Sequence, residues 1–272
     1  MKDLKVAISA PINDNIYSLL VTYLCISEPG IKVVGVYSLK LWSFKRFFNE
    51  FKRLRLSLLS KIWIKFFSLS SSQDPVEESS ELLKDKELEG FTLSSLCLEK
   101  NIPFRLFNDP NDQKTINFLN EANPDIILSI GSVILKEEFL GIPEEGVLNV
   151  HMGILPEYRG IGVTEWPILE SSSLKDIKLG ITLHLLERGV DSGPIIFSKS
   201  ILINSGDTIE KIEAKFLPMM VETMLDGVRL ARDKKLNQMK RTQDAEGKQY
   251  YFLHYRMKQK VSEKLNNLLN ES

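Results

Sequence analysis

The residues with the clearest potential for chemistry are Asn149 and His151, which stand two positions apart at the end of an apolar run. Val147 to Val150 is predicted to be the end of a buried strand, and strand residues two apart point to the same face. At the carboxyl end of a strand in an α/β sheet, that face opens into a crevice where ligands bind. The alternative is a histidine packed in the core beside a turn that closes the strand.

Another polar group follows in a turn further along the chain. Ile181 to Phe197 is predicted to form a strand, a turn and a second strand, with Asp191 in the turn between Gly189 and Gly193. An amide can donate to an oxygen that gains negative charge, an imidazole can carry a proton, and a carboxylate can orient that imidazole. Each of these side-chain types can therefore take part in proton transfer or in charge stabilisation.

Together, these stretches resemble the formyltransferases that use 10-formyltetrahydrofolate. The family pattern is N-x-H, a Leu-Pro turn, a (Y/K)-(R/K)-G step and a G-(V/T)-D-x-G-P loop. It matches here the stretches NVH, LP, YRG and GVDSGP, between Asn149 and Pro194. The resemblance covers roughly Met1 to Arg232, apart from an insertion. It implies that Asn149, His151 and Asp191 are catalytic and that the Leu-Pro bond is often cis.

The resemblance also implies a pocket for the co-substrate 10-formyltetrahydrofolate. Loop backbone groups would hydrogen bond the pterin, and apolar side chains would enclose it. The expected lining residues are Ser129, Gly131, Val133, Ile134, Leu135, Gly189 and Val190. The attacking nitrogen belongs to the acceptor amine, so no covalent intermediate is required, and no metal is required either. His184 is interpreted as a structural residue or as a neighbour that supports the site.

The elements that position these residues predict a Rossmann-like, doubly wound α/β fold with a mostly parallel sheet. The expected strands are Leu4–Ser9, Ile31–Tyr37, Pro103–Leu106, Asp125–Ile130, Val147–Val150, Gly180–Leu186 and Ile195–Ile203. The expected helices are Asn13–Ser27, Phe91–Lys100, Asp112–Ala122 and one that begins at Asp207 or Thr208 and runs to about Ala231. The first turn has no glycine-rich phosphate-binding pattern.

Leu39 to about Glu89 is predicted to be a helical insertion. Up to Ser68, apolar residues recur at intervals of three and four, and the charged residues are almost all basic. Such a helix suits an anionic membrane surface, or it packs on its own domain or on a second subunit. The Ser-rich and acidic residues that follow are predicted to form a mobile linker.

Composition limits the other classes of function. The chain has 272 residues, 43% of them hydrophobic, and a formal net charge of -1, which gives no general attraction to nucleic acid or membrane. Two cysteines offer no disulfide framework, and the charged amino terminus leads directly into a strand instead of a signal peptide. We therefore expect a cytoplasmic protein. Membrane contact through residues 39–68 and a homodimer are both left open.

The acceptor follows from the expected domains, a catalytic domain over 1–232 and a short C-terminal extension over 233–272. Methionyl-tRNA formyltransferases add an RNA-binding β-barrel, for which this extension is too short. We therefore expect an amino sugar, carried on a nucleotide or a lipid, as the acceptor, and no nucleic-acid partner. The alternatives are methionyl-tRNA formylation, an inactive interaction or membrane-surface module, and folate deformylation. The tail's aromatic residues are expected to fold back on the domain.

Overall fold

The computed structural model describes residues 2–40, 77–131, 134–243 and 247–271. The basic helix predicted after Leu39, and with it the predicted membrane contact, lies outside these described residues. None of the helices in the described ranges is long and apolar enough to cross a bilayer.

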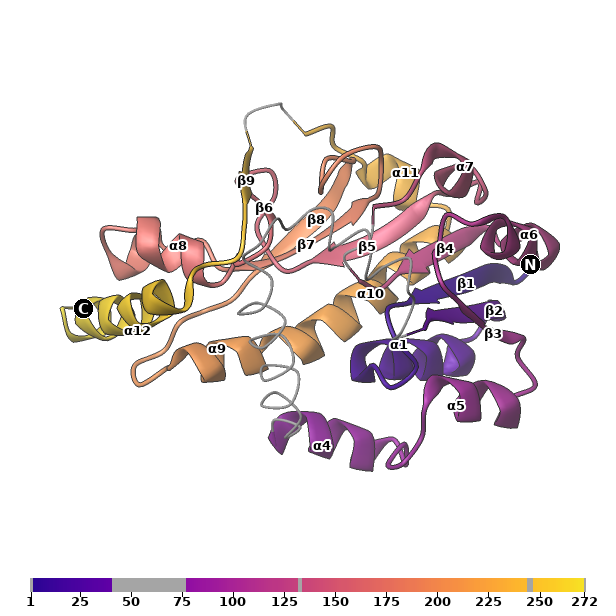
Figure 1. Cartoon of the computed structure of the whole chain (residues 1–272), viewed down its shortest axis with the longest axis horizontal. Helices are drawn as coiled ribbons and strands as arrows, with labels where there is room; N and C mark the ends of the chain where they lie inside the picture. The colour runs from indigo at the N-terminus through magenta and orange to yellow at the C-terminus, as the bar shows by residue number, and fades with distance from the viewer. Residues whose placement is uncertain (1, 41–76, 132–133, 244–246, 272) are drawn as a thin grey trace, which may run out of the picture.

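A seven-stranded sheet forms the centre of the molecule, in the order β3-β2-β1-β4-β5-β7-β8 (Figure 1). Its strands are β1 Leu4–Ala10, β2 Ile31–Leu39, β3 Phe104–Phe107, β4 Ile126–Ser129, β5 Val147–His151, β7 Gly180–Leu185 and β8 Ile195–Ser200. The strands from β3 to β5 pair in parallel, and β7 is antiparallel to both of its neighbours. The predicted strands and the mostly parallel sheet are therefore confirmed.

Helices cover both faces of this sheet, as near-continuous apolar strands require. In β1, Val6 and Ile8 join the larger core cluster with residues of α1 (Ile16–Ser27) and α10 (Phe216–Arg232). Ala7, between them, faces the smaller cluster with residues of α6 (Gln113–Ala122) and α7 (Glu137–Leu140). Figure 1 shows α1 and α10 below the sheet and α7 above it. The fold is thus doubly wound, as predicted.

Two helical predictions need correction. The prediction of a mobile linker is wrong for the second half of that segment, because residues Glu77–Asp85 form helix α4 and Leu88 is buried in the core. The single helix expected up to Ala231 is divided at Lys215 into α9 (Ile209–Ala214) and α10. Thr208 is the N-cap of α9, and its hydroxyl accepts a hydrogen bond from the backbone of Lys211. Helix α5 (Leu93–Glu99) has a capping box built by Thr92 and Ser95.

The C-terminal tail folds back on the domain, as expected. Its strand β9 (Lys248–Tyr250) pairs in parallel with β6 (Tyr158–Gly160), and helix α12 (Tyr255–Asn270) contacts α8 (Glu165–Glu170). The remaining short elements are the 3₁₀ helix η1 (Leu174–Asp176) and α11 (Leu236–Met239). The tail therefore builds part of the surface next to the end of β5.

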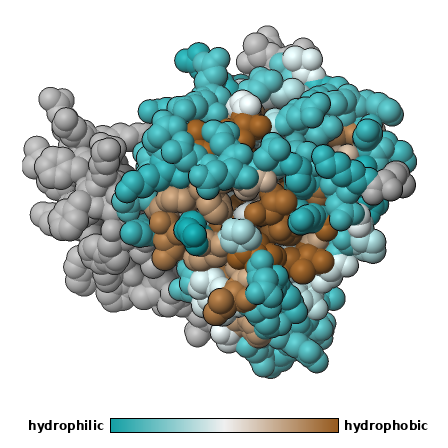
Figure 2. Space-filling model, turned by 90° about the vertical axis from the view of Figure 1, so that its right-hand side faces the viewer, coloured by the Kyte–Doolittle hydropathy of each residue, from teal (hydrophilic) through white to brown (hydrophobic). Residues whose placement is uncertain are grey.

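The side of the molecule that carries α6 and α7 has hydrophobic residues near its centre, surrounded by hydrophilic residues (Figure 2). Apolar area of this kind is common on folded proteins, since polar side chains cannot cover a whole surface.

The two cysteines, Cys25 and Cys97, are buried free thiols, and burial raises the pKa of each to about 12. Both thiols are therefore protonated packing groups at neutral pH.

Candidate active site

Asn149 is fixed at the carboxyl ends of β4 and β5. Its Nδ2 donates to the carbonyl oxygen of Ser129, the last residue of β4, at 2.8 Å. Its Oδ1 lies 3.2 Å from Nε2 of His184, its partner across the β5–β7 pair. Because an amide group has two N–H donors, one N–H of Asn149 remains without a partner among the described residues. It can donate to a bound ligand.

His151 ends β5, and its ring contacts strand β6 and the β7–β8 loop. Nε2 lies 2.7 Å from the carbonyl oxygen of Tyr158, and Nδ1 lies 3.6 Å from Oδ2 of Asp191. The ring is 7% exposed. A Cβ at Gly153 would come within 2.8 Å of both His151 Nε2 and Tyr158 O. Gly153 is therefore required for this approach of the imidazole to the Tyr158 carbonyl.

Asp191 reaches the site from the loop between β7 and β8. Its backbone is left-handed, with φ of 50°, which is uncommon for a residue other than glycine. Its Oδ2 accepts a hydrogen bond from the backbone N–H of Gly160 at 2.8 Å. The carboxylate is thus held between β6 and the imidazole of His151. Strained backbone of this kind is frequent at functional sites.

His184 belongs to the same group of side chains. It is fully buried on β7, with Nε2 4.0 Å from Oδ1 of Asp191. Burial, and then the neighbouring charge of His151, lower the pKa of His184 to about 4, and the Asp191 carboxylate opposes this shift. His184 is therefore neutral near pH 7 and carries one N–H. In one tautomer Nε2–H donates to Oδ1 of Asn149 and orients that amide, and in the other Nδ1–H donates to the carbonyl of Leu185, 3.1 Å away.

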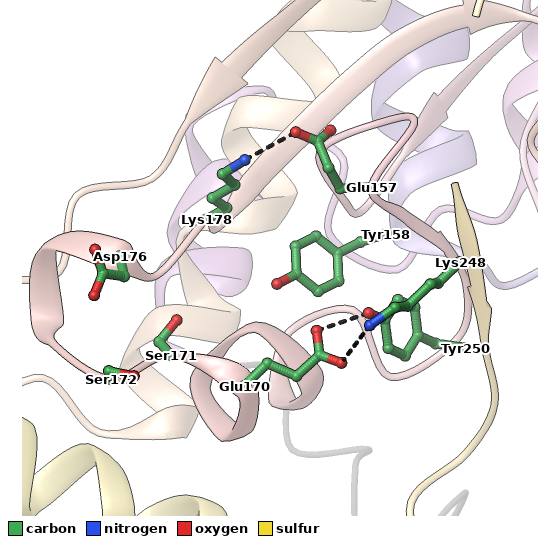
Figure 3. A pocket seen from close by; sticks show the side chains of 9 residues that line it. All are labelled: Glu157, Tyr158, Glu170, Ser171, Ser172, Asp176, Lys178, Lys248 and Tyr250. Carbon is green, nitrogen blue, oxygen red and sulfur yellow. Dashed lines mark hydrogen bonds and ion pairs between the residues drawn. The ribbon is translucent and has the colours of Figure 1, made fainter. Parts of the chain in front are cut away.

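A pocket lies around the side chain of Tyr158 (Figure 3). It has a volume of about 420 Å³ and is lined by Glu157, Tyr158, Glu170, Ser171, Ser172, Asp176, Lys178, Lys248 and Tyr250. Lys178 and Glu157 form an ion pair at 2.9 Å, and the Tyr250 hydroxyl donates to Glu170 at 2.7 Å. The rings of Tyr158 and Tyr250 are stacked, with centroids 5.2 Å apart. The catalytic candidates do not line this pocket, but the backbone of Tyr158 connects it to His151.

Comparison with known proteins assigns the chain to a family. A family model described as formyl transferase matches residues 88–228, which is more than half of the chain. The chain belongs to the formyl transferase family. It is 28% identical over 151 residues to the methionyl-tRNA formyltransferase of Clostridioides difficile, a match that covers 55% of this chain and 48% of that protein. For the enzyme of Francisella philomiragia, identity is 31% over 116 residues, or 42% of this chain and 36% of that one.

The formyl transferase chain thus spans about half the length of the curated relatives it matches. Solved structures with the same fold include phosphoribosylglycinamide formyltransferase from Anaplasma phagocytophilum, with a TM-score of 0.57, 16% identity and coverage of 92% of this chain and 100% of that one. They also include the sugar 3N-formyl transferase WlaRD, with a TM-score of 0.53, 14% identity and coverage of 98% and 80%. At these identities, the likeness shows the fold.

The residues predicted to line the co-substrate pocket of this formyl transferase lie in two loops. Glu137, at the start of α7, forms an ion pair with Arg188 of the β7–β8 loop at 3.5 Å, so the loops are neighbours. Gly131, Ile134 and Gly189 are exposed, and Val190 is half-buried. Ser129 is buried and its carbonyl binds Asn149, whereas Leu135 packs in the smaller core cluster. Val133 lies outside the described residues.

Sequence reasoning missed several groups that hold the candidate site together. The carbonyl of Tyr158 and the N–H of Gly160 are backbone groups, which no residue type announces. Gln243, in the tail, contacts the Asp191 loop through its side chain. The Leu155–Pro156 bond is cis, as the family pattern implied. No group of three or more His, Cys, Asp or Glu side chains within the described ranges could hold a metal ion.

Proposed function

We propose that this chain transfers the formyl group of 10-formyltetrahydrofolate to the primary amine of a small acceptor, with Asn149, His151 and Asp191 as the catalytic residues. The observation that carries the proposal is the contact between His151 and Asp191, 3.6 Å apart, beside the amide of Asn149. Membership of the formyl transferase family supports it. Residues 1–232 are proposed as the catalytic domain and 233–272 as its extension.

The hydrogen bonds of His151 give it a role in proton transfer. When Nε2–H donates to the Tyr158 carbonyl at 2.7 Å, the neutral ring carries no proton on Nδ1. Nδ1 then faces the Asp191 carboxylate and can take up the proton that the attacking amine loses. The resulting imidazolium would lie against the negative charge of Asp191, which stabilises it. As the bond between the formyl carbon and N10 of the co-substrate breaks, that nitrogen would take the proton back from the imidazolium, and tetrahydrofolate would leave.

Asn149 would bind the group that accepts negative charge. The co-substrate supplies a formyl carbon whose oxygen becomes more negative as the amine attacks. The free N–H of Asn149 is a neutral donor suited to that oxygen, and it is held in place by Ser129 and His184. A fixed donor needs no rearrangement as the reaction proceeds, which is the main advantage of a preorganised site.

The two neighbouring loops offer what a pterin ring requires. Exposed backbone at Gly131 and Gly189 provides hydrogen-bonding groups, and the side chain of Ile134, 61% exposed, provides apolar surface. Asn111 fixes the first loop, since its side chain binds the backbone of Ile134 at 2.9 Å and of Lys136 at 2.7 Å. We place the co-substrate there, with Ser129, Val133, Leu135 and Val190 as the further proposed lining residues.

The pocket in Figure 3 favours an amino sugar as the acceptor. Carboxylates and hydroxyls bind sugar hydroxyl groups, and tyrosine rings pack against the apolar face of a pyranose. Two of its three carboxylates form ion pairs, Glu157 with Lys178 and Glu170 with Lys248. With Asp176 the lining keeps one net negative charge, which would attract an amine that arrives in its protonated form. Methionyl-tRNA is the second candidate, because the curated relatives that match most of the catalytic region are methionyl-tRNA formyltransferases.

The test is to offer the protein 10-formyltetrahydrofolate with a panel of nucleotide-linked amino sugars and with charged initiator tRNA. Formylated product is detected by mass spectrometry, and the Asp191→Asn variant serves as the inactive control. Formylation of an amino sugar by the wild type, lost in the variant, supports the proposal. Formylation of tRNA alone would reverse the choice of acceptor. Release of formate with no formylated amine would indicate a deformylase, and no turnover of the co-substrate would refute the activity.

A further inference from the structure

The side chain of Gln243 joins strand β6 to the β7–β8 loop, which carries Asp191. Its Nε2 lies 3.0 Å from the carbonyl oxygen of Asp191 and 2.6 Å from that of Gly193. Its Oε1 accepts a hydrogen bond from the guanidinium of Arg159 at 2.8 Å. Both N–H donors and the carbonyl oxygen of one amide are therefore used, and they connect the β7–β8 loop to β6.

The backbone on either side of this contact is also tied to the loop. Arg241 forms an antiparallel bridge with Ile195, the first residue of β8, with N···O distances of 2.8 and 2.9 Å. The bridge places Gln243 beside the end of the β7–β8 loop before its side chain makes any contact. The amide therefore meets the loop from a fixed backbone.

Asp191 has a conformation that requires such support. A left-handed backbone is unfavourable at a residue with a Cβ, and it persists only where the surroundings enforce it. Gln243 binds the carbonyl of Asp191 itself and that of Gly193, two residues later. The peptide groups on the C-terminal side of Asp191 are thus held, while Gly160 holds its carboxylate from the other side.

We propose that Gln243 is a positioning residue, which keeps the Asp191 carboxylate against His151 by holding the backbone of the β7–β8 loop and the guanidinium of Arg159. Its effect on turnover rests on the proposed formyl transfer, whereas its effect on the loop does not. The amide is suited to this role because it carries two donors for the carbonyls and an acceptor for Arg159. Replacement by Leu removes all three contacts, and replacement by Glu turns an oxygen toward the two carbonyls.

The first test measures the loop without any substrate. In the ¹H–¹⁵N spectrum of the full chain, the amide of Gly160 reports its hydrogen bond to the Asp191 carboxylate. We expect the Gln243→Leu and Gln243→Glu variants to shift this resonance and to speed hydrogen exchange in the β7–β8 loop by about tenfold, the factor that one lost hydrogen bond can produce. Gln238→Leu, at an exposed position of α11, should change neither.

The second test measures turnover of the same variants with the acceptor identified from the panel. We expect kcat to fall by about tenfold or more, with KM for 10-formyltetrahydrofolate nearly unchanged, because a misplaced proton-transfer group slows the chemical step. An unchanged Gly160 resonance together with unchanged loop exchange in both Gln243 variants would overturn the proposal. A wild type with no activity would refute the proposed function alone, since the spectra are recorded without substrate.

Discussion

The backbone N–H of Gly160 donates to Oδ2 of Asp191 at 2.8 Å, and this is the same carboxylate oxygen that faces Nδ1 of His151 at 3.6 Å. One strand of the small β6–β9 sheet therefore helps to set the position of the acidic group. The neighbouring carbonyl of that strand, from Tyr158, binds the other nitrogen of the same imidazole. His151 and Asp191 are thus held by two consecutive peptide groups, those on either side of Arg159.

The Asp191→Asn variant tests the charge at this position. The amide keeps the size of the side chain but cannot stabilise a protonated His151. We expect kcat to fall by on the order of a hundredfold or more, the usual scale for a proton-transfer group, with little change in melting temperature. Asp233→Asn, at an exposed position after α10, is the matched control and should retain full activity. Near-normal kcat in Asp191→Asn would show that this carboxylate does not take part.

Gly160→Ala tests the pairing of β6 with β9. Gly160 has φ of 92°, and a Cβ there would lie 2.3 Å from the carbonyl oxygen of Tyr250. Gly206 has φ of 80° and open space around it, so Gly206→Ala carries the backbone cost alone, about 1–2 kcal/mol. We expect urea unfolding to show a larger loss of unfolding free energy for Gly160→Ala than for Gly206→Ala. We also expect Gly160→Ala to lose activity. Equal losses of unfolding free energy in the two variants would mean that the tail moves away from the added methyl group at no cost in free energy.

His184 predicts a pH dependence of stability. Its pKa is lowered to about 4 in the folded protein, mainly by burial, so the unfolded chain binds this proton more readily below its ordinary pKa. Stability from this group is complete above about pH 6.5 and is lost as the pH falls toward 4, by on the order of 3 kcal/mol in total. Urea unfolding at several pH values should show a weaker acid dependence for His184→Gln.

The control for that experiment is His254→Gln, because His254 is an exposed histidine in the tail. This variant should keep the acid dependence of the wild type. If His184→Gln loses stability between pH 6.5 and 4 as steeply as the wild type does, groups other than His184 are responsible.

Glu170→Gln tests the proposed acceptor pocket. Glu170 accepts from the Tyr250 hydroxyl at 2.7 Å and lies 3.5 Å from the ammonium of Lys248. Removing its charge should raise KM for an amino-sugar acceptor by about tenfold, the effect of one charged hydrogen bond, and leave KM for 10-formyltetrahydrofolate unchanged. Glu263→Gln, on the exposed side of α12, should change neither constant. A change confined to the folate KM would place the acceptor elsewhere.

The central sheet and the grouping of Asn149 with His151 were predictable because they depend on local patterns. Buried parallel strands are continuous apolar runs, and the alternation along β5 places residues two apart on one face. Asp191 was found through its glycine-flanked loop, which belongs to a family pattern. These features are written within a few residues of the chain.

The small sheet and the role of Gln243 depend on distant pairing, which local patterns do not encode. β6 and β9 are short segments of mixed polarity, YRG and KQY, and their β structure comes from the tertiary contact. Gln243 lies in a polar stretch. From the local sequence, a glutamine whose amide binds two carbonyls cannot be distinguished from a glutamine whose amide is in water. The break between α9 and α10 at Lys215 was missed although Pro218 marks it: a proline has no N–H to donate to the carbonyl of Ala214, so one helix cannot continue through this turn.

The contact between Gln243 and Asp191 has a consequence for the order in which the protein acquires its site during synthesis. The two residues are separated by 52 positions, and β9 follows Gln243 in the sequence. A nascent chain that has left the ribosome as far as β8 already contains Asn149, His151 and Asp191, but not the groups that hold the loop from the tail. Translation therefore delivers the three reactive side chains before the segment that organises them.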